Sequence, residues 1–405
     1  MKKWRNALLA AVILLSALLC ACSLLPQLIP SQSNSPSPTT VAPTPSAAQI
    51  KWDGQVQNGI PSIEDTYFIR NMPEKERELC IGIYQGIMAF EEEIKFPEPV
   101  DEETLSDAMW LLSYDCPELF QISGDYSYYV REDIPEKVLS VKPTYILSET
   151  EYEQASAKIQ GILANWLKAA AGLDDFEKER LIYDSIIQCC DYREDGVHAG
   201  TAYGALVLGQ ARCEGYSKAL CMALRAADIP CLILTGEAWS PEEENARPEK
   251  HAWNVARIGR SYYEMDITWD DSDGQLPQGT CYAYFNLTDK EMYQSRQLDD
   301  IYEGWGLPVC DDTVQNYYVR SGAYFKDGVD LKEAFQDALS TAYENGETLV
   351  MARVETDEQM EDIQEHLKAW MENWMNRRRL SSVSYNWMTY KGSRVFCILG
   401  LTYEK

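Results

Sequence analysis

The stretch that decides the fold begins with ARCEGYSKALCMALRAADIPCLILTGEA (residues 211–238) and, after a polar loop, continues with HAWNVARIGRSYYEMDITWDD (residues 251–271). It contains a thiol at Cys213, an imidazole at His251 and a carboxylate at Asp266. A thiol, a base and an acid that orients the base are the parts of a nucleophilic catalytic site. Whether the chain can bring them together depends on the elements that carry them.

Cys213 stands at the predicted start of a helix. Behind it, apolar residues recur at the spacing of one helix face: Tyr216, Leu220, Leu224 and Ala227. Asp228 and Pro230 are typical of a helix end. The first turn of a helix has free backbone N–H groups and the positive end of the helix dipole. This position therefore favours a thiolate, which is the reactive form of cysteine.

Three strands are predicted after this helix, at residues 231–238, 251–258 and 261–268. The two residues Gly259 and Arg260 fit a two-residue hairpin turn between the last two strands. In that register His251 and Asp266 are diagonal neighbours on one face of the hairpin. A three-residue loop would place them on opposite faces, so the prediction depends on loop length.

The order of cysteine, helix, strand, histidine, strand and aspartate resembles the transglutaminase-like superfamily, which includes papain-fold peptidases and amidases. The matching motifs are Cys213-Glu-Gly-Tyr-Ser, His251-Ala-Trp-Asn and Asp266-Ile-Thr-Trp-Asp. The resemblance implies an α+β, papain-like core in which the cysteine helix packs on an antiparallel sheet bearing the histidine and aspartate. It also implies Cys213 as nucleophile, His251 as base and Asp266 as the acid that orients the base.

Such chemistry needs an oxyanion donor near the thiol. The backbone N–H of Cys213 is one candidate, and the side chain of Gln210 or Tyr203 is a candidate for the second. Gly215 and Trp253 are further residues expected near the substrate. The sequence leaves the choice of the second donor open.

Other residues compete for these roles. His198 is a rival base, although its surroundings, REDGVHAG, are typical of an exposed loop. Asp270 and Asp271 are rivals for the orienting acid. The chain has three histidines and no CxxC motif, so neither a metal site nor a cofactor is predicted. The twelve cysteines show no spacing typical of a disulfide framework.

Residues 1–22 are predicted to be a lipoprotein signal peptide. Three basic residues precede an apolar run at 7–19 that is short for a membrane span. The tetrapeptide Leu-Cys-Ala-Cys resembles a bacterial lipobox with Cys22 as the lipidated residue, and Cys20 is the poorer candidate. We therefore expect an exported protein anchored through this lipid to the outer face of the cytoplasmic membrane.

Four further segments are predicted after the signal. Residues 23–50 are rich in Ser, Pro and Thr and form a linker that cannot bury a core. Residues 51–150 are expected to form an N-terminal α+β region, similar to regions that precede the core in exported clostridial-type members of the superfamily. Residues 151–300 would be the core, closed by a strand at 282–287. Residues 311–405 are expected to form an α+β module that starts with a strand in 317–325 and has a split β-α-β layout.

The chain carries 64 acidic and 36 basic residues, a net charge of −28. This charge argues against binding of nucleic acid and against electrostatic adhesion to anionic lipid. We expect a protein or peptide substrate, with cell-wall peptide as one candidate. The sequence gives no indication of oligomeric state.

These features favour an exported thiol-dependent acyl-transfer enzyme that hydrolyses an amide, or passes the acyl group to an amine, through a thioester on Cys213. The alternative is a non-catalytic surface lipoprotein that binds peptide or cell wall and retains the same pocket.

Overall fold

A computed structural model describes most of the chain beyond the predicted linker. The described residues are 56–57, 60–131, 133–241, 245–271, 276, 280–390 and 392–404. The predicted signal peptide, Cys22 and the linker lie outside them. Within this described part, no helix is long and apolar enough to span a bilayer, and the ten cysteines it contains are not disulfide-bonded.

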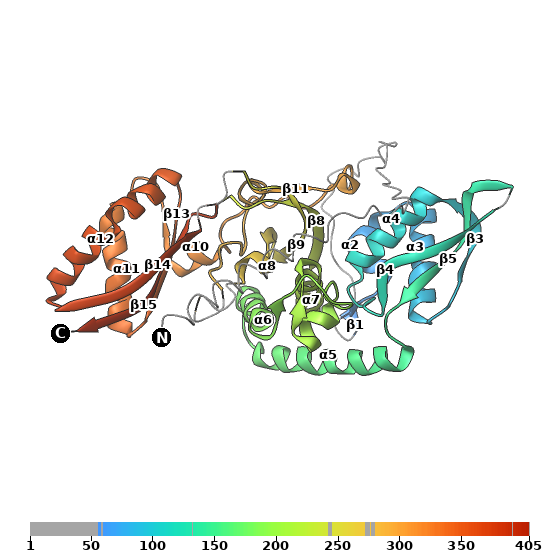
Figure 1. Ribbon diagram of the computed structural model, residues 1–405, viewed down its shortest axis with the longest axis horizontal. Helices are drawn as coiled ribbons and strands as arrows, with labels where there is room; N and C mark the ends of the chain where they lie inside the picture. The colour runs from blue at the N-terminus through green and yellow to red at the C-terminus, as the bar shows by residue number, and fades with distance from the viewer. Residues whose placement is uncertain are drawn as a thin grey trace, which may run out of the picture. The chain divides into compact units, whose positions relative to one another are not determined.

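The N-terminal region is built on a three-stranded antiparallel sheet with the order β3-β5-β4. Two longer helices, α3 and α4, accompany this sheet (Figure 1). Its elements are β1 (Val56–Gln57), β2 (Ile60–Pro61), the 3-10 turn η1 (Ile63–Asp65), α2 (Tyr67–Asn71), α3 (Glu74–Met88), β3 (Ile94–Asp101), α4 (Glu102–Asp115), β4 (Ile122–Arg131) and β5 (Ile134–Tyr145).

The central part is an antiparallel sheet with the order β10-β9-β8-β11, against which helix α7 packs (Figure 1). Its elements before the sheet are α5 (Glu149–Ala169), α6 (Asp175–Cys189), β6 (Asp191–Tyr192), the π-helical turn η2 (Gly204–Leu208), β7 (Gln210–Ala211) and α7 (Cys213–Ala226). The sheet and its connections are β8 (Cys231–Ala238), β9 (Glu249–Ile258), β10 (Ser261–Met265), α8 (Ile267–Asp270), α9 (Asp289–Met292), β11 (Arg296–Leu298) and the 3-10 turn η3 (Asp300–Tyr302).

Helix α7 is fixed on the sheet by its apolar stripe and by two polar contacts. Tyr216, Leu220 and Leu224 have no exposed surface. Ser217 Oγ donates to the carbonyl of Ala252 on β9 at 3.0 Å, and the side-chain amide of Asn254 donates to the Ser217 carbonyl at 3.0 Å. Buried polar groups that satisfy one another in this way fix a single alignment of helix and strand. The start of α7 is thereby held beside β9.

The hairpin has the expected register, in which Ser261 pairs with Ile258 across the two-residue turn. Gly259 takes a left-handed φ of 63°, which explains why glycine suits this position. Strand β10 is shorter than predicted and ends at Met265. Asp266 instead caps the short helix α8, where its side chain accepts a hydrogen bond from the backbone N–H of Trp269.

The strand expected at 282–287 to close the core does not form. Tyr282 and Asn286 adopt left-handed φ angles of 51° and 55°, which are incompatible with a continuous strand. Only Leu287 joins the sheet, through an isolated bridge to Glu264. The fourth strand is β11, which pairs with β8 and contains Arg296.

The C-terminal module contains α10 (Tyr317–Ser321), β12 (Tyr324–Phe325), α11 (Leu331–Asn345), β13 (Leu349–Val354), α12 (Asp357–Arg378), β14 (Ser382–Tyr390) and β15 (Val395–Glu404). Its sheet has the order β12-β13-β15-β14, so β15 separates β13 from β14 and gives the split β-α-β layout. The prediction of a strand throughout 317–325 was wrong, because its first half is the helix α10, which Asn316 caps.

Candidate active site

Cys213 is the first residue of α7. The preceding Arg212 is extended and takes the N-cap position, and Cys213 is 9% exposed. The two-stranded β6–β7 ladder leads into it and pairs Tyr192 with Ala211. The thiol therefore lies where the first backbone N–H groups of a long helix are free to stabilise negative charge.

His251 lies on β9 and reaches Asp266 through Nε2, which is 2.7 Å from Asp266 Oδ2. The side chain of His251 is 8% exposed and that of Asp266 has no exposed surface. The thiol of Cys213 also hydrogen-bonds to the imidazole of His251. The structure thus brings the thiol, the imidazole and the carboxylate into one chain of contacts.

The charge of this site favours a protonated imidazole. Burial lowers the pKa of His251, but the charge and hydrogen bond of Asp266, followed by those of Cys213, outweigh burial and raise the pKa to about 9. Burial raises the pKa of Asp266, yet its contacts with His251 and Arg296 reverse this effect and lower the pKa to about 2. Near neutral pH the pair is an imidazolium and a carboxylate.

Arg296 is a residue of the site that the sequence reasoning missed. Its Nη2 and Nε donate to Asp266 Oδ2 at 2.5 and 3.2 Å, and its side chain has no exposed surface. It comes from β11, thirty residues after Asp266. The segment QSRQLDD has no motif that marks an arginine as buried, so no signal in the sequence pointed to it.

The residues expected near the substrate occupy different surroundings. Trp253 is fully buried and donates its Nε1–H to Glu264 at 2.8 Å. Gly215 is buried, and a Cβ there would lie 2.4 Å from the carbonyl oxygen of Ala199, so glycine allows the preceding loop to pack on α7. These two residues are therefore buried in the core.

The two candidate oxyanion donors also differ. Gln210 is exposed on β7, three residues before the thiol. Tyr203 is half-buried, with its ring stacked at 5.9 Å on Phe120 and edge-on at 5.1 Å to His198. Tyr192, to which the sequence reasoning gave no role, is 45% exposed, and both burial and the charge of Cys213 raise its pKa. Tyr192 is therefore near enough to Cys213 for their charges to interact.

The rivals for the base and the acid are engaged elsewhere. His198 packs against Tyr203 in its loop. Asp270 accepts the hydroxyl of Tyr183 at 2.7 Å, and Asp271 accepts the hydroxyl of Tyr216 at 2.7 Å. Among these acids, Asp266 is the one that hydrogen-bonds to His251.

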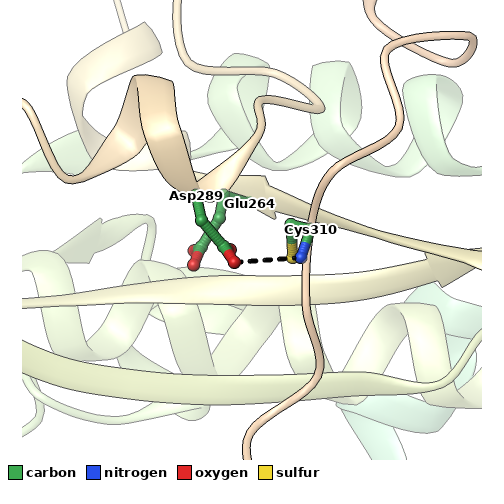
Figure 2. A group of neighbouring side chains, drawn as sticks. All are labelled: Glu264, Asp289 and Cys310. Atoms are coloured by element: carbon green, nitrogen blue, oxygen red, sulfur yellow. Dashed lines mark hydrogen bonds between the residues drawn. The ribbon is translucent and has the colours of Figure 1, made fainter.

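A second group consists of the buried Glu264 and Cys310 and the partly buried Asp289, which come from three separate segments (Figure 2). Their ligand-type atoms lie within 4.8 Å of one another. The oxygens of Glu264 accept hydrogen bonds from Trp253 Nε1 and from the hydroxyl of Tyr293, both at 2.8 Å. The backbone N–H of Cys310 donates to Asp289 at 3.2 Å. Asp289 Oδ1 is buried and has no hydrogen-bond partner among the described residues, and we assign no metal to this cluster.

The sequence model of the Transglutaminase-like superfamily matches residues 167–267. The chain carries a transglutaminase-like domain. The match contains Cys213, His251 and Asp266, while Arg296 lies beyond it. The α+β fold predicted around this transglutaminase-like domain is confirmed.

No curated protein matches the chain. Solved structures similar to it include a provisionally assigned cysteine protease from Cytophaga hutchinsonii, with 15% identity, 36% of this chain and 61% of that chain covered, and a TM-score of 0.24. A TGase structure is 11% identical, and the match covers 44% of this chain and 50% of that chain with a TM-score of 0.24. A menin structure is 14% identical, and the match covers 66% of this chain and 52% of that chain with a TM-score of 0.25. The chain spans about half to three fifths of their lengths, and we base no argument on these likenesses.

The raised pKa of His251 predicts how the domain's stability depends on pH. A group whose pKa is raised from 6.5 to about 9 on folding stabilises the fold fully below pH 6.5, and this stabilisation is lost as pH rises through 9. The difference in unfolding free energy between wild type and His251→Gln should therefore shrink by about 3 kcal/mol between pH 6 and pH 10. Urea unfolding at both pH values measures it.

The matched control is His198→Gln, because burial, partly opposed by the charge of Glu151, lowers the pKa of His198. The difference in unfolding free energy between wild type and His198→Gln should not decline between pH 6 and pH 10. A constant difference for His251→Gln would show that the imidazolium does not stabilise the fold.

Proposed function

We propose that the chain is a thiol-dependent acyl-transfer enzyme acting on an amide of a protein or peptide. The observation that carries this proposal is the 2.7 Å contact between His251 Nε2 and Asp266 Oδ2, together with the hydrogen bond of the Cys213 thiol, at the start of α7, to the same imidazole. The family match over the same three residues supports a thiol-dependent enzyme. Hydrolysis and transfer to an amine share this first half-reaction.

In the proposed reaction the Cys213 thiolate attacks the amide carbonyl and forms a tetrahedral intermediate. The backbone N–H groups at the start of α7 are placed to stabilise its oxyanion. Collapse of the intermediate breaks the C–N bond, and His251 donates the Nδ1 proton to the leaving amine. The resulting thioester on Cys213 is then attacked by water or by a second amine, with His251 accepting the proton of that nucleophile.

The reactivity of Cys213 provides the first test. Iodoacetamide reacts with thiolates, so labelling at pH 7 should be at least about tenfold faster at Cys213 than at Cys189. Cys189 is a stringent control for access of the reagent, because it is exposed while Cys213 is buried. Peptide mapping by mass spectrometry after short exposure gives both rates on one sample.

His251→Ala should remove the advantage of Cys213 and leave the rate at Cys189 unchanged. Equal labelling of the two cysteines in the wild type, or an undiminished rate at Cys213 in His251→Ala, would contradict the proposed role of the pair.

We further propose that the enzyme is exported and anchored to the outer face of the cytoplasmic membrane by a diacylglycerol-type lipid on Cys22. The basic and apolar start of the chain and its lipobox support this proposal. Cys22→Ala should move the protein from the membrane fraction to the soluble or secreted fraction, as followed by immunoblotting, whereas Cys20→Ala should not. Membrane retention of Cys22→Ala, or wild type in the cytoplasm, would refute the anchor.

A further inference from the structure

The negative charge of Asp266 is buried between two cationic side chains. Oδ2 accepts from His251 Nε2 at 2.7 Å and from Arg296 Nη2 at 2.5 Å, and neither the Asp266 nor the Arg296 side chain has exposed surface. Oδ1 accepts the backbone N–H of Trp269 at 3.2 Å. One proton lies between Nε2 and Oδ2, and the charges around this hydrogen bond decide which of the two atoms holds it.

Resting on the proposed function, we infer that Arg296 is a positioning residue whose fixed positive charge keeps Asp266 ionised and the shared proton on His251 Nε2. Arg296 thereby sets the pH above which Cys213 becomes reactive. It acts through Asp266 and not by contact with substrate.

The need for a second cation follows from the proton count of the reaction. His251 loses its positive charge each time it donates a proton to the leaving amine. At that moment Asp266 would be an unpaired buried anion, which is strongly unfavourable. With Arg296 beside it, Asp266 remains paired whether His251 is charged or neutral. Without Arg296, the site would bind protons more tightly. The proton held by the thiol, imidazole or carboxylate would then dissociate only at a higher pH.

Arg296 itself is held in one orientation. Its guanidinium carbon lies 3.8 Å from the ring centroid of Trp269 and 4.9 Å from that of Tyr284. Its Nη1 donates to Ser295 Oγ at 2.6 Å and to the Ser295 carbonyl at 3.2 Å. A planar guanidinium between aromatic rings loses little entropy when it holds a carboxylate.

Other titratable groups also face this centre and enter the same balance. They come from α7, β10, α8, α6 and the segment before α9, and they are Cys213, Glu264, Asp270, Tyr183 and Tyr284. Burial raises the pKa of Asp270 to about 7 and that of Glu264 to about 8. Both acids are largely neutral below these values. Arg296 and Asp266 are therefore the permanent charges beside the imidazole in mildly acidic solution.

The test is the pH profile of Cys213 alkylation, which needs no substrate. In Arg296→Gln the midpoint pH of the alkylation profile should be higher by about one unit or more. Below the wild-type midpoint, alkylation of Cys213 should therefore be about tenfold slower than in the wild type. Arg296→Lys keeps a positive charge, so its profile should stay near that of the wild type. Rates are read by peptide mapping with iodoacetamide between pH 4 and pH 9, with folding checked by circular dichroism.

Arg353→Gln is the matched control. Arg353 Nη2 pairs with Glu291 at 2.6 Å, and the two side chains are 4% and 21% exposed, so its loss removes a mostly buried ion pair that does not include Asp266. It should lower stability without moving the alkylation profile. A shift in Arg353→Gln equal to that in Arg296→Gln would mean that general loosening of the fold, and not the charge of Arg296, moves the profile.

An unshifted or downward-shifted profile for Arg296→Gln would overturn the inference. If the Gln variant does not fold, Arg296→Lys decides alone: a profile within a few tenths of a pH unit of wild type supports the role, and displacement by about a unit contradicts it. Failure of the enzyme to turn over any amide would refute the proposed function and leave this result intact.

Discussion

The buried carboxylate of Asp266 is the constraint on which the rest of the site depends. A carboxylate with no exposed surface is stable only with charged or hydrogen-bonding partners on every side. His251, Arg296 and the backbone of Trp269 supply them. Each partner comes from a different element, so this one charge ties β9, β11 and α8 together around the thiol. The same arrangement raises the pKa of His251 and so favours an imidazolium beside Cys213.

The scaffold supports this centre through contacts made at a distance from it. Ser217 and Asn254 fix α7 on the sheet, so the start of the helix cannot slide relative to His251. Near the C-terminal end of the helix, Arg225 donates to the carbonyl and carboxylate of Asp115 at 2.7 and 3.1 Å. This buried pair joins the N-terminal region to the helix that carries the nucleophile. The N-terminal region is thus part of what positions Cys213, although it supplies none of the proposed chemistry.

The sequence predicted the parts that depend on local pattern. The apolar spacing behind Cys213 predicted α7, and Gly259-Arg260 predicted the register that puts His251 near Asp266. It failed where tertiary contacts decide. Nothing local marks Arg296 as buried, because its partners are Asp266 and two aromatic rings distant in sequence. Two aromatic-rich segments predicted as strands are not continuous strands: residues 282–286 (YAYFN) turn through the left-handed residues Tyr282 and Asn286, and the capped start of YYVRSGAYF is helical.

The central claim is that Cys213 forms a thioester during acyl transfer. Acid-quenched mixtures of the enzyme with a peptide library, with and without a primary amine, test it most directly by intact-mass and peptide-mapping mass spectrometry. We expect an acyl adduct on Cys213 that is absent in Cys213→Ala, scarce in Asp266→Asn, and resolved to a free acid or to an amide of the added amine. Turnover without an adduct on Cys213, or turnover that persists in Cys213→Ala, would contradict it.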